Sequence, residues 1–340
     1  MRVLLTSVGR RNYLVDYFRE ALAGTGQVWA SDCSPHAPAL YGADRAAMLP
    51  PVGSDEYTAA LLETCTRHEI KLVVPLIDPE LEILAPVYDR FLDAGVRLLV
   101  SPPETIDIGF DKFRTAQFAR QHGLAAPESV LSVAEALQAL RDGRMTWPLM
   151  VKPRRGSASL GLHVCRTAEE LHAAFRSADL DMIQQFLEAD EYGYDLLCDF
   201  ECRPVSVFCK KKLAMRSGET DKAVSTGRAE LIEFGRRVAE VLDLRGPLDA
   251  DVFLTDDGPQ LLELNPRFGG GYPCSHGAGA DFPGKLVRMV RGETVEPDIG
   301  TCPEGVHMFK QYDIVIRRAD EVAAIAAAPD NMALKPPRRP

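Results

Sequence analysis

The first hundred residues alternate short apolar runs with amphipathic stretches, and no other feature of the sequence constrains the fold as strongly. The runs typical of strands are 2–8, 27–32, 71–77 and 96–101, and the stretches with helical periodicity are 10–24, 54–70 and 79–95. Strands that alternate with helices form a parallel sheet, so this part predicts a doubly wound α/β domain. In such domains ligands bind at the carboxyl ends of the strands.

Charged residues follow two of these predicted strands. Arg10 and Arg11 come just after the first strand, where they would grip a carboxylate or a phosphate. Asp78 and Glu80 follow the strand 71–77, where they would bind an amine. Two plainer interpretations stay open, because arginines at a helix start can face water and acids there complement the helix dipole.

Composition narrows the class of protein. The chain has 340 residues, which is enough for two or three packed domains, and its net charge of -10 argues against nucleic acid and anionic membranes as partners. The apolar run at the N-terminus is too short for a signal peptide or a membrane span. The eight cysteines are scattered without a CxxC pair, so we expect reduced thiols and a cytoplasmic location.

The pattern changes from about residue 127. Strand-like segments now follow one another as hairpins, including 150–153 with 162–165 and 194–200 with 203–212, and a long amphipathic helix is predicted over 225–244. The last thirty residues predict one strand, a short Ala-rich helix and a mobile KPPRRP tail. This part is therefore predicted to be α+β.

The stretch LLELNPRFGGG (261–271) places three polar side chains, Glu263, Asn265 and Arg267, at every second position. Side chains of a strand alternate between its faces, so these three share one face. Asp251 lies 12 residues before Glu263 on the other arm of a predicted hairpin. If Leu254 pairs with Gln260, five residues form the turn and Asp251 stands opposite Glu263.

These residues form a set of hard oxygen donors. Two carboxylates and an amide oxygen suit Mg²⁺, which usually keeps waters and takes phosphate oxygens, so a nucleotide is implied. Arg267 is a fork for a phosphate or a carboxylate. Gly269 and Gly270, with the glycine after them, would let backbone N–H groups approach an anion. The alternative is a solvated hairpin with a chance polar face.

Other parts of a nucleotide site occur along the chain. Lys152 lies in an apolar strand, where a phosphate would be its partner, although a lysine at a sheet edge can also extend to solvent. The loop RRGSASLG (154–161) offers backbone donors at Gly156 and hydroxyls at Ser157 and Ser159. Along DMIQQFLEADE (181–191), backbone groups would read adenine and Glu191 would reach ribose, unless Glu191 is simply a surface acid.

Taken in order, these pieces resemble the ATP-grasp superfamily. The matching residues are DK at 111–112, VKP at 151–153, the loop 154–161, the hinge QQFLEADE at 184–191, Asp251 and ELNPR at 263–267. Single pieces are weak, but the ordered set with its E-x-N-x-R is specific. The chain is most similar to a stand-alone unit of the carbamoyl-phosphate synthase large-subunit type.

The resemblance implies a division of the chain and a set of roles. The division is an N-terminal substrate domain over 1–108, a small ATP-grasp lobe over 109–187, a large lobe with the metal site over 188–310, and a C-terminal segment over 311–340. The cofactors implied are ATP and one or two Mg²⁺ ions, with Mn²⁺ as an alternative. The implied ligands are Lys112 and Lys152 for phosphates, Gln184, Gln185, Phe186 and Leu187 for adenine, Glu191 for ribose, and Asp251, Glu263 and Asn265 for the metal.

The resemblance also implies catalytic roles, and this sequence departs from the family pattern at two positions. Arg267 and Lys152 would stabilise the transferred phosphoryl group. Asp251 stands where many relatives have Glu, and its shorter reach would shift the metal. Gln184 stands where many relatives have an acid next to adenine, so the hinge would rely more on backbone contacts.

A charged segment, MRSGETDKAVS (215–225), precedes the metal hairpin. Lys210, Lys211 and Lys212 come just before it. A charge run is usually a solvated face, and that interpretation stays open here. The functional alternative is a loop that closes over the phosphates or the acid substrate, with Arg216 and Lys222 as its contacts.

The predicted reaction is ATP-dependent ligation of a carboxylate to an amine through an acyl phosphate, releasing ADP and phosphate. Activation of bicarbonate or carbamate is the alternative within this family. A nicotinamide-dependent oxidoreductase is disfavoured because SVGRRN lacks the GxGxxG fingerprint, and an inactive ATP-binding regulator is disfavoured by the intact acidic set. The sequence leaves open the two substrates, a homodimer, and whether His276 is a base or a structural residue.

Overall fold

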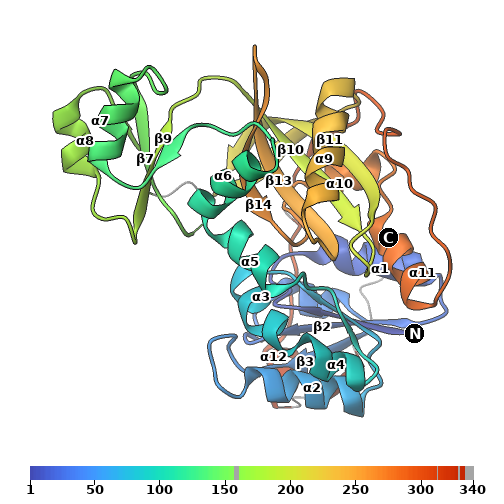
Figure 1. Ribbon diagram of the computed structural model, residues 1–340. Helices are drawn as coiled ribbons and strands as arrows, with labels where there is room; N and C mark the ends of the chain where they lie inside the picture. The colour runs from blue at the N-terminus through green and yellow to red at the C-terminus, as the bar shows by residue number, and fades with distance from the viewer. Residues whose placement is uncertain (157–160, 312, 328–329, 334–340) are drawn as a thin grey trace. The chain divides into compact units, whose positions relative to one another are not determined.

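The computed structural model describes residues 1–156, 161–311, 313–327 and 330–333. The chain forms two compact units (Figure 1). Unit 1 comprises Met1–Pro103, Asp281–Glu296 and Gln311–Pro340, and unit 2 comprises Glu104–Ala280 and Pro297–Lys310. The segment 281–296, which the predicted division assigned to the large lobe, packs instead in unit 1, because its helix lies against the first helix of the chain.

Unit 1 contains a six-stranded sheet with strand order β16-β3-β2-β1-β4-β5. All neighbouring strands are parallel except β16, which runs antiparallel to β3. The strands are β1 (Arg2–Thr6), β2 (Gln27–Asp32), β3 (Arg45–Met48), β4 (Leu72–Pro75), β5 (Arg97–Leu98) and β16 (Asp330–Ala333). The sequence predicted β1, β2, β4 and β5, and it missed β3 and β16.

The helices of unit 1 follow from apolar spacing. In α1, the buried residues Leu14, Val15, Phe18 and Leu22 form one stripe, and the helix ends where Ala23 takes a left-handed conformation. The single helix expected over 79–95 is broken in three, because a proline at 86 interrupts it. The helical elements are α1 (Asn12–Leu22), η1 (Pro38–Gly42), α2 (Tyr57–Arg67), α3 (Asp78–Leu84), η2 (Ala85–Val87), α4 (Tyr88–Asp93), α11 (Phe282–Val290) and α12 (Ala319–Ala327).

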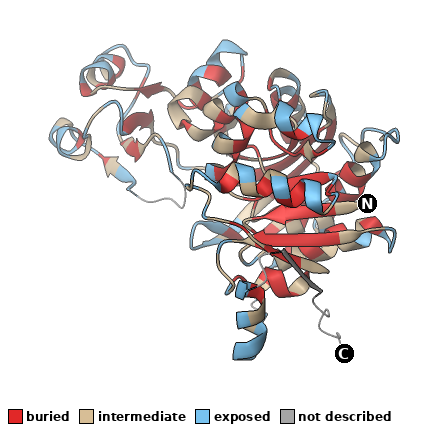
Figure 2. Cartoon of the chain, turned by 90° about the horizontal axis from the view of Figure 1, so that it is seen from below, coloured by how far each residue is buried: buried red, intermediate tan, exposed pale blue. Residues whose placement is uncertain are grey.

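The core of unit 1 lies on both faces of its parallel sheet. The central strands β1 and β4 are buried almost throughout, as expected for strands covered on both sides. In Figure 2 the strands beside the N-terminus are mostly in the red of buried residues. Strand order reverses at β1, which has β2 on one side and β4 on the other, so the carboxyl ends of β1 and β4 form the switch point at which ligands usually bind.

The smaller sheet of unit 2 is four-stranded, with order β6-β9-β7-β8. Its strands are β6 (Ser129–Val130), β7 (Leu149–Pro153), β8 (His163–Cys165) and β9 (Asp181–Gln185), and β7 pairs antiparallel with β8 as predicted. Helices α7 (Val133–Arg141) and α8 (Ala168–Ala174) lie on one side of β7 and β9 (Figure 1). Leu149, Val151, Leu171 and Ile183 form part of the core between these helices and the sheet.

The larger sheet of unit 2 is antiparallel, with order β14-β13-β10-β11-β12-β15. Its strands are β10 (Asp190–Cys198), β11 (Pro204–Arg216), β12 (Glu219–Thr226), β13 (Gly246–Thr255), β14 (Gly258–Asn265) and β15 (His307–Phe309). The remaining helices are α5 (Pro103–Phe110), which spans the boundary between the units, α6 (Lys112–Gln121), α9 (Ala229–Val241) and α10 (Tyr272–Gly277). Residues 103–121 are thus almost entirely helical.

Helix α9 covers one face of this sheet. Tyr194 on β10 donates its hydroxyl to Leu231 O on α9 at 2.7 Å. Gly235 sits within the helix because a Cβ there would lie 2.9 Å from both the Tyr194 ring and the Val207 side chain. The face of β10 and β11 that carries Tyr194 and Val207 therefore packs on α9, and the alternate positions of the same strands point to the opposite face, which carries the candidate site.

Candidate active site

Acidic residues of β13 and β14 pair across the hairpin on the face opposite α9. Asp251 stands opposite Glu263, and Asp249 stands opposite Asn265. The Asp251–Glu263 pairing is as predicted, but the predicted register of the tip is wrong. Leu254 pairs with Pro259, the turn between Thr255 and Gly258 has two residues rather than five, and the register shifts between Asp251 and Val252.

The bulge is what keeps the two acids together. Val252 pairs with Leu261 and Asp251 with Glu263, so Leu262 is the extra residue of β14. Without it, the register of the tip would place Asp251 opposite Leu262. A one-residue slip moves every side chain of a strand to the other face, so the bulge restores the acids to one face.

The residues present fit a divalent cation of the magnesium type. Asp251, Glu263 and Asn265 supply two carboxylates and an amide oxygen on one face of the hairpin, which is the donor set that Mg²⁺ takes in proteins. Burial raises the pKa of Asp251 to about 7, against the opposing effect of the Lys212 ammonium. Within the described residues, no three His, Cys, Asp or Glu side chains form a metal-binding group, so amide, water or phosphate oxygens must complete the coordination.

Two lysines of β11 lie on this same face. Lys212 Nζ is 2.6 Å from Asp251 Oδ1 and 2.7 Å from Glu191 Oε1. Lys210 Nζ is 2.5 Å from Asp195 Oδ2, which also accepts a hydrogen bond from the Ser275 hydroxyl. Burial alone would lower the pKa values of both lysines, but nearby carboxylates outweigh it and raise them. For Lys210 and Lys212, the solvated-face interpretation of the charge run is therefore wrong.

Arg267 lies just beyond β14 beside Asp249. Its Nη1 is 3.4 Å from Asp249 Oδ2 and donates to Phe268 O at 3.2 Å. A Cβ on Gly269 would come within 2.3 Å of Asp249 Cγ, and a Cβ on Gly271 within 2.5 Å of Lys210 Cε. Side chains of Asp249 and Lys210 thus occupy the space that a Cβ would take at Gly269 and Gly271. The approach of backbone N–H groups to an anion stays a prediction.

Lys112 joins the glycine-containing loop to the acidic face. Its Nζ lies 3.5 Å from Glu263 Oε1 and donates to Gly156 O at 2.5 Å. Its backbone N–H donates to Arg154 O at 2.9 Å, and Arg154 pairs with Asp111, the N-cap of α6. These contacts bring three of the predicted phosphate ligands and metal ligands together, while Ser157 and Ser159 lie outside the described residues.

Lys152 is buried and held by a one-way chain of hydrogen bonds. Its Nζ donates to Gln184 Oε1 at 2.7 Å, Gln184 Nε2 donates to Ser129 Oγ at 2.9 Å, and Ser129 donates to Pro127 O at 2.9 Å. The carbonyl at the end can only accept, so every donor points the same way. Burial, reinforced by Lys112 and opposed by Glu263, lowers the pKa of Lys152 to about 8.

The predicted adenine hinge follows β9. The Gln185 backbone N–H donates to Glu128 O at 2.8 Å, and its side chain bonds the backbone at Thr146, so neither is free to read a base. Phe186 and Leu187 are half-buried beyond the strand. Glu191, the predicted ribose ligand, lies on the acidic face and pairs with Lys212.

The charged segment over 215–225 forms a β-hairpin. Arg216 pairs with Glu219 around a two-residue turn, in which Ser217 and Gly218 have positive φ. Lys222 pairs with Ala214 and with Phe309 of β15, and both Arg216 and Lys222 are exposed. Closure of this hairpin over phosphates or the acid substrate, with Arg216 and Lys222 as its contacts, stays a prediction.

His276 lies on α10 beside Tyr272. The Tyr272 hydroxyl donates to Ala280 O at 2.6 Å and lies 3.2 Å from His276 Nδ1. Since the hydroxyl proton is already used, Nδ1 must carry the proton that this contact shares. The arrangement supports the structural interpretation of His276.

The substrate candidates of unit 1 separate into two kinds. Arg10 is exposed and Arg11 is the residue before α1, while Gly9 donates its N–H to Asp32 at 3.0 Å. Asp78 begins α3. Glu80, by contrast, is fully buried and accepts a hydrogen bond from the Tyr57 hydroxyl, so it does not present a carboxylate to an amine.

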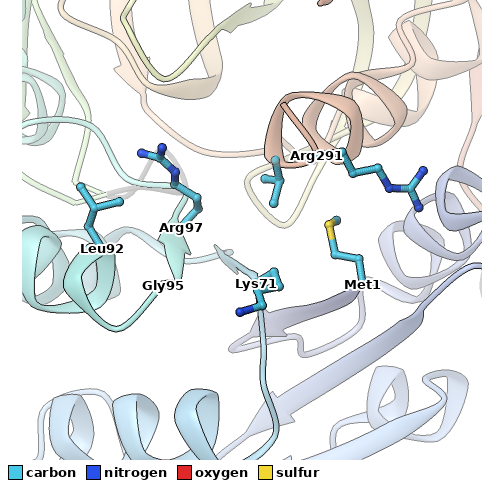
Figure 3. A pocket seen from close by; sticks show the side chains of 7 residues that line it. Met1, Lys71, Leu92, Gly95, Arg97 and Arg291 are labelled. Carbon is cyan, nitrogen blue, oxygen red and sulfur yellow. The ribbon is translucent and has the colours of Figure 1, made fainter. Parts of the chain in front are cut away.

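A hollow of about 410 Å³ lies at the amino ends of β1, β4 and β5. Lys71, Arg97 and Arg291 line it together with Met1 and Leu92. Figure 3 shows the charged ends of the three basic residues pointing in different directions. The hollow is thus walled by side-chain stems and backbone, and it offers no convergent anion site.

Comparison with known proteins now identifies the domains. Residues 3–99 match the family described as PylC-like, N-terminal domain, and residues 110–271 match the family described as ATP-grasp domain. The chain therefore carries an ATP-grasp domain, as the sequence motifs predicted, and a PylC-like N-terminal domain in front of it. Among the described residues, no helix is both long and apolar enough to cross a lipid bilayer.

The relatives include ligases and synthases. The carbamoyl phosphate synthase large chain of Mycobacterium tuberculosis is 24% identical over 253 residues, covering 68% of this chain but only 22% of the relative. Phosphoribosylamine–glycine ligase of Brucella melitensis is 27% identical over 310 residues, covering 79% of this chain and 67% of the relative. The chain thus spans about a fifth of the synthase large chains that it matches.

Solved structures share the fold. Biotin carboxylase from Campylobacter jejuni superposes with a TM-score of 0.73 at 15% identity, covering 90% of this chain and 74% of that one. L-amino acid ligase from Bacillus licheniformis superposes with a TM-score of 0.64 at 18% identity, covering 86% and 75%. The predicted fold, a parallel α/β domain followed by antiparallel ATP-grasp sheets, is confirmed.

Sequence reasoning missed several residues of the candidate site, on the acidic face of the larger sheet and beside Lys152 in the smaller one. They are Ser129, Gly193, Asp195, Asp249 and the inward orientation of Lys210 and Lys212. One signal could have found the lysines, because Phe208, Lys210 and Lys212 alternate along one strand as Glu263 and Asn265 do along another. No local signal marks Ser129, whose role depends on pairing with Gln184 from a distant segment.

Proposed function

We propose that this protein is an ADP-forming carboxylate–amine ligase. It activates a small-molecule carboxylate as an acyl phosphate with ATP and joins it to an amine. The observation that carries the proposal is the acidic face, on which Asp251 pairs with Glu263, Asn265 follows, and Arg267 comes next. The ATP-grasp domain and the ligases among the relatives support it.

The cofactor roles follow from donor chemistry. Asp251, Glu263 and Asn265 would hold one or two Mg²⁺ ions, or Mn²⁺ in their place, and the ion would neutralise phosphate charge. Lys112 would contact phosphates from the loop side and Lys152 from β7. Gln184 would orient Lys152, while Phe186 and Leu187 would carry the adenine contacts, since the Gln185 N–H is already bonded.

The chain's own side chains would supply positioning and charge rather than a nucleophile. Phosphoryl transfer needs mainly alignment and neutralisation of the equatorial oxygens. Arg267, on its anchor Asp249, would hold the transferred group and then the acyl phosphate. Attack by the amine on the acyl carbon then releases phosphate and forms the amide bond.

The acid or the amine would enter from the switch point of unit 1. Arg10 and Arg11 follow β1, and Asp78 follows β4, the strands between which the order reverses. Arginines there suit a carboxylate or phosphate on the substrate, and Asp78 suits an ammonium group. A homodimer stays a prediction, which light scattering of the purified protein tests directly.

Nucleotide products test the proposal. The purified chain is incubated with ATP and Mg²⁺ and with pools of small acids, amino acids and bicarbonate, beside a Glu263→Ala control. ADP and phosphate released only with a particular acid–amine pool, and lost in the control, support the ligase. ADP with bicarbonate alone would mean activation of bicarbonate or carbamate, while AMP and pyrophosphate would exclude the acyl-phosphate mechanism.

A further inference from the structure

Lys212 reaches across a neighbouring strand to one of the proposed metal ligands. It belongs to β11, and β10 lies between β11 and β13 in the sheet. Its ammonium nevertheless lies 2.6 Å from Asp251 Oδ1 on β13, as well as 2.7 Å from Glu191 Oε1 on β10. The Lys212 side chain is only 6% exposed, so it is committed to this position.

Gly193 makes this crossing feasible. It is the residue of β10 that pairs with Asp251 on one side and with Lys210 on the other. A Cβ at this position would lie 3.3 Å from Lys212 Cε and 3.4 Å from Lys210 Cε. Because both stems pass over the glycine, the sheet keeps a gap through which lysines of β11 meet acids of β13 and β10.

The two lysine pairs on this face differ in what their acids can still do. Lys210 and Asp195 are 1% and 3% exposed, and the Ser275 hydroxyl bonds the same carboxylate oxygen as Lys210. Asp251 is 19% exposed, and Lys212 Nζ, which is 2.6 Å from its Oδ1, is shared with Glu191. The first pair is closed, whereas Asp251 remains able to take another cation.

We propose that Lys212 is an internal counter-cation that competes with the divalent metal ion for Asp251, with Glu191 retaining its ammonium when the ion binds. This inference rests on the proposed metal site. A magnesium ion takes carboxylate oxygens at about 2.1 Å. With Lys212 Nζ 2.6 Å from the same oxygen, the two cations would be less than about 5 Å apart and would repel each other.

The competition sets how tightly the free protein holds metal. Lys212 keeps the carboxylates of Asp251 and Glu191 compensated, so removing its charge leaves more uncompensated negative charge for the ion. It follows that the free enzyme binds metal weakly and prefers an ion that arrives with a nucleotide, whose phosphates supply further oxygen ligands.

Direct metal binding tests this inference on the full chain without nucleotide. Free Mn²⁺ is followed by electron paramagnetic resonance at low salt. Lys212→Met is expected to bind Mn²⁺ at least about tenfold more tightly than wild type, since one repelling charge is gone. Lys212→Arg keeps the charge and is expected to stay within about threefold of wild type. Lys211→Met is the matched control. Lys211 lies on the other face of β11, where it pairs with Asp190 of β10.

The outcomes separate this inference from the proposed function. Glu263→Gln is expected to abolish Mn²⁺ binding, and unchanged binding in that variant would remove the metal site and the inference with it. If Glu263→Gln loses binding while Lys212→Met binds as wild type or more weakly, the site stands and the competition is overturned. Should Lys212→Met not fold, Lys212→Gln replaces it, and the metal-dependent rise in Tm, expected to exceed that of wild type, gives a second readout.

Discussion

Carboxyl groups in the two units have different kinds of partner, a tyrosine hydroxyl in unit 1 and lysine ammonium groups in unit 2. In unit 1, Glu80 accepts a hydrogen bond from the Tyr57 hydroxyl, and burial raises its pKa without any cation to oppose it. In unit 2, Asp195 and Asp251 each face a lysine ammonium. A hydroxyl partner suits a carboxyl group that stays neutral, whereas a lysine ammonium opposes the rise in pKa that burial causes and favours the ionised acid.

The comparison also explains where glycines occur. The acids of unit 2 and their lysines fill the same face, so Gly193, Gly269 and Gly271 leave the volume that these side chains occupy. Glu80 instead has hydroxyl partners on separate elements, Tyr57 on α2 and Thr6 on β1. Charge pairs in a sheet therefore constrain the backbone sequence beyond the charged residues themselves.

The largest expected loss of stability comes from removing the buried ammonium of Lys210. Lys210→Met would leave Asp195 buried without its partner, and such losses cost about 3–5 kcal/mol in free energy of unfolding. Urea unfolding measures it, with Lys211→Met as the control, because that pair is exposed and contributes under about 1 kcal/mol. Equal stability of the two variants would break the contrast between the clusters.

Crowding the acidic face comes next. In Gly269→Ala the new Cβ would overlap Asp249 Cγ at 2.3 Å, and overpacking of this kind costs about 1–3 kcal/mol. The displaced Asp249 would also release Arg267. We therefore expect the activation free energy of ATP turnover to rise by more than the free energy of unfolding falls. Gly53→Ala is the control, since nothing lies within 4 Å of its Cβ. A turnover loss no greater than that of the control would disconnect Asp249 from Arg267.

Removing the hydroxyl partner in unit 1 should matter less. Tyr57→Phe deletes the donor to a neutral buried carboxyl group, which costs about 0.5–1.5 kcal/mol. Thermal unfolding followed by circular dichroism measures the change. A loss as large as that of Lys210→Met would indicate that Glu80 is ionised in the native state, contrary to the comparison.

The smallest effect at neutral pH is expected for Glu80→Gln, but its pH dependence is diagnostic. Because the native pKa of Glu80 is raised, the native state binds a proton that the unfolded state has released, and this stability is lost as pH rises above 4.5, the ordinary value, through the native pKa. Glu80→Gln lacks this proton-linked contribution to stability. The difference in unfolding free energy should therefore shift in favour of Glu80→Gln from acidic to neutral pH, and a flat difference would contradict a neutral Glu80.

The sequence predicted which acidic residues share a face better than it predicted their packing. The period-two spacing of Glu263, Asn265 and Arg267 defined one face, and Asp251 joined it as expected. The glycines were predicted to serve an anion, which stays a prediction, and two of them make room for Asp249 and Lys210. Spacing along one strand reports a face, whereas space between side chains depends on neighbours that are distant in sequence.

By itself, the sequence determined the alternation of strands and helices, the hairpins of unit 2 and the identity of the acidic set, because these follow from local periodicity. Only the tertiary structure decided the bulge at Leu262, the crossing of Lys212 over Gly193, the hydrogen-bond chain from Lys152 to Pro127 and the burial of Glu80. Each of these depends on register or on contacts between separate strands and helices, and the free energies that settle them arise when side chains leave water together.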